Sequence, residues 1–253
     1  MKTFLFELCA ETLNAAKVAD QCGANRIELC TRLDIGGITP DEQLTTAVLQ
    51  ALSIPVHVLI RPRGGNFFYT TDEFEQMRQQ VQWVKQAGAA GVALGVLLPD
   101  GRIDVSRNRE LLELARPMNV TFHRAFDRAP DLDEALEAVI SVGADCILTS
   151  GGAPNVLAGA DQLEKLVRQA GSRIQIMAGG GLKLASMLEV LERTGLSCLH
   201  GSLARAAGEC ILESASADTP VKETDTLDAD VRTAVRLMRN HFDKREVAAQ
   251  AMR

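Results

Sequence analysis

The strongest constraint on the fold of this chain is a pattern that repeats eight times. Short apolar runs of strand length alternate with stretches of helical periodicity. Strands that alternate with helices in this way form βαβ units and a parallel sheet. The apolar runs lie at residues 3–8, 26–30, 55–60, 91–96, 119–123, 146–149, 174–178 and 198–201.

The segments between the runs predict helices and mark where they end. Four junctions from helix to strand carry a glycine just before the strand, and glycine suits the left-handed residue that ends many helices. These glycines are Gly23, Gly88, Gly143 and Gly195. The clearest helical patterns are Thr12–Cys22, Asp72–Gln86, Asp131–Val142 and Leu184–Arg193.

Eight such units within about 200 residues predict a closed (β/α)8 TIM barrel. An open doubly wound sheet is the alternative fold, but no Gly-x-Gly-x-x-Gly motif follows the first run. We expect one domain over residues 1–253, with the barrel over about 3–205 and a tail with a closing helix over about 206–253.

The predicted tail consists of a polar connection at residues 213–224 and a helix from Thr226 to about Arg245. Val231, Val235 and Met238 recur at helical spacing, so we expect this face to pack on the barrel.

Composition limits the class of protein. The net charge of −6 and the lack of a Lys/Arg stripe argue against a nucleic-acid partner. No run of eighteen apolar residues could span a membrane, and Glu7 comes too early for a signal peptide. The six cysteines are scattered, as expected for reduced thiols. We therefore expect a cytoplasmic protein without a membrane partner.

A doubled Glu-Leu-Cys motif ends the first two predicted strands. It occurs as Glu7-Leu8-Cys9 and again as Glu28-Leu29-Cys30. Because side chains alternate faces along a strand, each Glu shares a face with its Cys while Leu takes the other face. Two neighbouring strands should thus bring two carboxylates and two thiols together.

Other predicted strands place polar residues at the same end of the barrel, which is the working end of barrel enzymes. An interior glutamate must be paired or protonated, and we expect Arg61 and His123 to be the partners of the two motif glutamates. His57 lies mid-strand and reads as a satisfied core residue. The further residues at this end are Thr121, Arg124, Asp127, Cys198 and His200.

Glycine-rich loops after the sixth, seventh and eighth runs suggest an anion site, because exposed backbone N–H groups bind anions there. The same glycines could merely permit tight turns. The candidate residues are Thr149, Ser150, Gly151, Gly179, Gly180 and Ser202.

The loop at residues 61–69 carries two arginines, Arg61 and Arg63, two glycines and three aromatic residues. It suggests a cationic lid over the barrel mouth, since Arg pairs with carboxylate or phosphate. The alternative is that its aromatic rings pack the loop onto the barrel or onto a second subunit.

Together these segments resemble the CutC family of copper homeostasis proteins. The resemblance rests on Arg61–Gly65, Thr121–Asp127, Leu148–Gly151 and the second Glu-Leu-Cys, and it runs from about residue 4 to the end. The loop after the last strand and the tail depart slightly from it. The resemblance implies a TIM barrel, a cytoplasmic location, a homo-oligomer, a role in copper handling, and Cu(I) ligation at Cys9 and Cys30.

Two functions remain open from the sequence. The first is Cu(I) binding through Cys9 and Cys30, since soft ions prefer thiolates. The second is an isomerase- or lyase-type enzyme that acts on an anionic metabolite, such as a phosphorylated one. In that second function the acid–base and charge-holding candidates are Glu7, Glu28, Arg61, His123, Arg124 and Asp127, and the ligand-binding candidates are Arg63, His200 and the loop residues named above.

Overall fold

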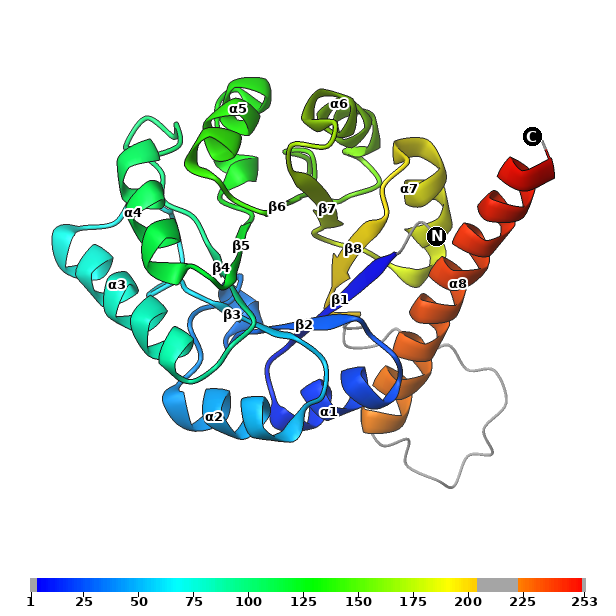
Figure 1. The fold of residues 1–253 in the computed structure, drawn as a ribbon, viewed down its shortest axis with the longest axis horizontal. Coiled ribbons are helices and arrows are strands. Elements are labelled where there is room, and N and C mark those ends of the chain that lie inside the picture. Colours follow the sequence, from blue (N-terminus) through cyan, green and yellow to red (C-terminus); the bar gives the residue numbers. More distant parts are fainter. Residues whose placement is uncertain (1–3, 204–222, 252–253) are drawn as a thin grey trace.

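The computed structural model describes residues 4–203 and 223–251. Eight parallel strands close into a barrel in the order β1 to β8, and helices surround it (Figure 1). The prediction of a (β/α)8 TIM barrel is confirmed. The strands are β1 Leu5–Ala10, β2 Arg26–Leu29, β3 Val56–Leu59, β4 Gly91–Leu94, β5 Asn119–Phe122, β6 Cys146–Thr149, β7 Gln175–Gly179 and β8 Cys198–Gly201.

The helices of the outer layer begin and end where local chemistry favours it. Thr70 and Glu73 form a capping box at the start of α3, in which each side chain accepts from the other residue's backbone N–H. The helices are α1 Leu13–Gln21, α2 Glu42–Ala51, α3 Thr71–Gln86, α4 Val105–Ala115, α5 Leu132–Val142, α6 Ala160–Ala170, α7 Met187–Thr194 and α8 Glu223–Ala251. Three 3₁₀ turns are η1 Leu33–Ile35, η2 Phe126–Arg128 and η3 Leu184–Ser186.

The four predicted junction glycines all adopt a left-handed backbone, with φ between 68° for Gly195 and 89° for Gly88. This conformation ends the helix and turns the chain into the next strand within a few residues. The one helix predicted at 184–193 is divided by the structure into η3 and α7.

The alternation of side chains along the strands separates two apolar regions. Leu8 and Leu29 point outward and belong to the large cluster between the barrel and the helices. Cys9 and Cys30 point inward and pack with Leu59 in a smaller cluster inside the barrel. The predicted division of the Glu-Leu-Cys motifs between two faces is therefore confirmed.

Helix α8 lies against α1 and α7 and closes the ring of helices (Figure 1). Val231, Val235 and Met238 are buried as predicted, and Phe242 stacks on Phe4 with ring centroids 6.0 Å apart. The predicted polar connection at 213–224 falls almost entirely outside the described residues. None of the described helices has both the length and the apolar composition needed to cross a membrane.

Candidate metal and ligand site

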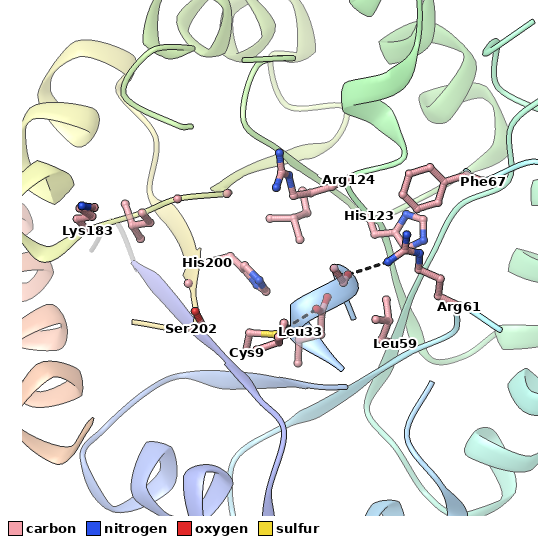
Figure 2. A pocket seen from close by; sticks show the side chains of 17 residues that line it. Cys9, Leu33, Leu59, Arg61, Phe67, His123, Arg124, Lys183, His200 and Ser202 are labelled. Atoms are coloured by element: carbon pink, nitrogen blue, oxygen red, sulfur yellow. Dashed lines mark hydrogen bonds between the residues drawn. The ribbon is translucent and has the colours of Figure 1, made fainter. Parts of the chain in front are cut away.

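A cavity of about 320 Å³ opens at the C-terminal ends of the strands, which we call the barrel mouth (Figure 2). Eight of the residues proposed from the sequence line it: Cys9, Glu28, Arg61, His123, Arg124, Gly180, His200 and Ser202. The cavity is also lined by Phe67 of the proposed lid, Leu148 of the Leu148–Gly151 segment and Gly181 of the glycine-rich loop after β7. Sequence reasoning missed the other lining residues: Leu33, Gly36, Leu59, Leu182, Lys183 and Gly201.

The two motif cysteines meet at the floor of this cavity. Cys9 Sγ lies 3.4 Å from Cys30 Sγ, and both residues are free thiols. Cys9 faces the cavity, whereas Cys30 lies behind it and is fully buried. The hydrogen bond with Cys30 and burial both raise the pKa of Cys9 above its usual value, so Cys9 stays a thiol until a ligand displaces its proton.

A chain of charged groups lies beside the thiols, inside the barrel. Arg26 Nε donates to Glu7 Oε2 at 2.5 Å, and Glu7 Oε1 shares a hydrogen bond with His200 Nδ1 at 2.7 Å. Burial alone would raise the pKa of Glu7, but the Arg26 charge and the His200 hydrogen bond outweigh it and hold the pKa at about 2. Glu7 is therefore an anion that fixes the His200 ring through Nδ1. Burial lowers the pKa of His200, but the charge of Glu28 and the hydrogen bond with Glu7 outweigh it and raise that pKa, so Nε2 must lose its proton before it can ligate a metal.

Glu28 completes a group of three potential ligands. One ligand atom from each of Cys9, Glu28 and His200 lies within 4.8 Å of the other two. Burial raises the pKa of Glu28 and outweighs the opposing charge of His200. Its Oε1 accepts a hydrogen bond from Cys9 Sγ at 3.7 Å.

The expectation that Arg61 and His123 pair with the two glutamates is wrong. Arg61 instead donates to the backbone carbonyls of Gly36 and Gly37 at 2.9 and 2.8 Å and to Gly65 at 3.0 Å. It thereby ties the loop after β2 to the loop after β3, with its guanidinium 4.7 Å from the centre of the Phe67 ring.

His123 is held as a neutral ring. Its Nδ1 accepts from the backbone N–H of Ala125 at 3.2 Å, and its ring centre lies 5.0 Å from that of Phe67. Burial and the nearby charge of Arg61 lower the pKa of His123 to about 3. His57 is buried mid-strand, as expected, and burial lowers its pKa to about 4. Its Nδ1 has no hydrogen-bond partner among the described residues, so the prediction that His57 is a satisfied core residue is wrong for this atom.

Asp127 organises a loop and does not line the cavity. It accepts from Thr149 Oγ1 at 2.5 Å and from the backbone N–H groups of Ser150 and Gly152. Arg124 Nε donates to the same carboxylate at 2.8 Å. The loop after β6, proposed from the sequence as an anion site, therefore already encloses a carboxylate of the chain itself.

The remaining candidates are distributed between structural and cavity positions. Gly151 donates its N–H to Thr149 within the Asp127 loop, and Gly179 packs against Leu148 and His200. Arg63 bonds to Glu73 in the proposed lid, away from the cavity lining.

The chain is similar to known proteins over most of its length. The model of the CutC family matches residues 4–205. The chain belongs to the CutC family. It is 45% identical over 196 residues to the family protein CutC of Mesorhizobium japonicum, covering 78% of this chain and 76% of that protein. It is 41% identical over 199 residues to the human copper homeostasis protein cutC homolog, and this match covers 79% of this chain and 73% of the human protein.

A solved CutC structure has the same architecture. The crystal structure of CutC from Streptococcus agalactiae superposes with a TM-score of 0.75 at 30% identity, and covers 80% of this chain and 100% of the other. The resemblance to the CutC family that the sequence motifs predicted is thus confirmed.

Proposed function

We propose that this CutC-family chain binds Cu(I) at the floor of the barrel mouth, with Cys9 and Cys30 as the thiolate ligands. The observation that carries the proposal is the distance of 3.4 Å between the two sulfurs. Thiolates select soft ions such as Cu(I), and a thiol must lose its proton to ligate.

The geometry favours a third ligand. With metal–sulfur bonds of about 2.3 Å, sulfurs 3.4 Å apart subtend an angle of about 95° at the ion. This bent pair leaves the cavity side of the ion open. His200 lies on that side beside Cys9, and its Nδ1 is engaged by Glu7, so its Nε2 is the ligand we propose (Figure 2).

The Arg26–Glu7–His200 chain supports this assignment. A histidine that ligates a metal commonly donates its other ring N–H to a carboxylate, which fixes the tautomer and orientation of the ring. Glu7 occupies that position, and Arg26 neutralises it.

The enzymatic alternative has less support from the same geometry. Glu7 is paired within the barrel interior and Asp127 with the loop after β6. Of the acid–base carboxylates it requires, Glu28 lines the cavity of 320 Å³, and Asp127 lines the adjoining cavity but is held by the loop after β6.

An anaerobic Cu(I) titration against a chromophoric competitor tests the proposal. We expect one equivalent of Cu(I) in the wild type, with strongly reduced affinity in Cys9→Ser and Cys30→Ser. Cys198→Ser is the matched control, because Cys198 is an equally buried free thiol in a separate interior cluster. Equal affinity in the wild type and in the Cys9→Ser/Cys30→Ser double variant would remove the proposed site.

A further inference from the structure

The charge around the cavity does not suit a bare copper ion. Four cationic side chains line either this cavity or a second cavity beside it: Arg61, Arg124, Arg128 and Lys183. We call this set the cationic rim. Glu28 and Asp127 are the carboxylates among the same lining residues, and the whole chain carries a net charge of −6. The barrel mouth therefore concentrates positive charge in an acidic protein.

Two of these cations are held in place by the chain, and two carry a charge that no described carboxylate pairs with. Arg61 is 5% exposed and held by backbone carbonyls. Within the described part of the chain, neither Arg61 nor Arg128 forms an ion pair with a carboxylate. Arg124 is locked by Asp127 and by Ser150, and lies flat on Gly180, where an added Cβ would be 2.7 Å from its guanidinium carbon. A preorganised positive field of this kind attracts anions and repels free cations.

The cationic rim and Cys9 line two adjoining cavities that share part of their walls. Arg61, Gly36, Phe67 and Arg124 line both the 320 Å³ cavity above Cys9 and the adjoining cavity of about 600 Å³. The two cavities together are large enough for a small organic ligand. One molecule can thus reach the rim with charged groups while its metal-binding atom reaches Cys9.

We propose that copper enters as an anionic complex with a small thiol that bears carboxylates, and that the cationic rim binds those carboxylates. This inference rests on the proposed Cu(I) site and adds the chemical class of the donor. Two thiolates on one Cu(I) leave a net negative charge even before the carboxylates are counted, so the rim attracts the complex.

The transfer is a ligand exchange without change of oxidation state. A bond forms between Cys9 Sγ and Cu(I) as a bond from Cu(I) to a donor sulfur breaks, and Cys30 then replaces the second donor sulfur. Each departing donor thiolate takes up the proton that the corresponding protein thiol releases.

Stopped-flow transfer of Cu(I) under anaerobic conditions tests the inference with two donors. One is Cu(I)–glutathione, which carries carboxylates, and the other is Cu(I) with the neutral thiol 2-mercaptoethanol. We measure the ratio of the two transfer rates in the wild type, in Arg124→Gln, in Arg128→Gln and in Arg173→Gln. Arg173 is the matched control, because it precedes β7 at the opposite end of the barrel and pairs with Glu137.

We expect the ratio to fall about threefold or more in each rim variant and to fall with added salt, while Arg173→Gln keeps the wild-type ratio. S-methylglutathione, which has the carboxylates but no free thiol, should slow transfer from glutathione. Arg128→Gln keeps the test valid if Arg124→Gln disturbs the Asp127 loop, because no described carboxylate pairs with the Arg128 side chain. Uptake from both donors with an unchanged ratio in both rim variants would overturn the inference alone, whereas no uptake from either donor would overturn the copper site itself.

Discussion

The buried Glu7 carboxylate makes a strong prediction for stability. Glu7 is 1% exposed and is held between Arg26 and His200. Its pKa falls from the usual 4.5 to about 2, which corresponds to about 3 kcal/mol of stabilisation of the folded state. Independently, removal of one partner of a buried ion pair costs about 3–5 kcal/mol, because it leaves the other charge uncompensated. We expect Glu7→Gln to lower the free energy of unfolding by about 3 kcal/mol at pH 7.

The dependence on pH follows from the sign of the shift. Because the folded-state pKa is lowered, the stabilisation is fully present above the unfolded value near 4.5 and is lost as the pH falls toward 2. The cost of Glu7→Gln should therefore be about halved or less by pH 3. Urea unfolding followed by circular dichroism measures it.

A matched control and a double variant isolate the ion pair. Glu137→Gln makes the same carboxylate-to-amide change in an exposed pair with Arg173 and should have a much smaller effect. The Glu7→Gln/Arg26→Met double variant should cost less than the sum of the single changes. A cost of Glu7→Gln below about 1 kcal/mol at pH 7, or one that does not decline in acid, would refute the reasoning.

Three further predictions concern other parts of the barrel. The pKa of His123 is lowered to about 3, so between pH 6 and 5 the unfolded chain binds a proton at this residue while the folded chain does not. His123→Gln should therefore reduce the slope of the unfolding free energy against pH in this range by about 1 kcal/mol per pH unit, as measured by urea titrations. Gly91→Ala should destabilise the barrel by about 1–3 kcal/mol in the same assay, since its Cβ would lie 2.4 Å from His57 Nε2; an unchanged midpoint would contradict this. Glu7→Gln should weaken Cu(I) binding about 10–100-fold in the competition titration through the orientation of His200, and full retention of affinity would exclude His200 as an oriented ligand.

The sequence was sufficient to predict the fold because its signals are local and repeated. One βα unit is specified by its apolar run, its helical periodicity and, in four units, a junction glycine such as Gly88 or Gly143. Eight such units in sequence predict a closed barrel, which the structure confirms. Strand alternation then placed Cys9 and Cys30 on the inner face, where the structure brings their sulfurs together.

The partners of the charged residues were harder to predict. Arg26 lies on the same strand face as Glu28, and the alternation rule applied toward the start of β2 would have found it as the cation for Glu7. The partners of Arg61 depend on how the loop after β2 folds back over β3, which no periodicity in the sequence encodes. Asp127 resembled a catalytic carboxylate because its hydrogen-bond partners come from a loop more than twenty residues later.

The most direct test of the copper site is X-ray absorption spectroscopy of the protein loaded with one equivalent of Cu(I). The proposed site predicts two sulfur ligands and one nitrogen ligand in the wild type, and loss of the nitrogen signal in His200→Gln with both sulfurs retained. A copper environment that lacks two sulfurs, or that is the same in the wild type and in Cys9→Ser/Cys30→Ser, would contradict the assignment.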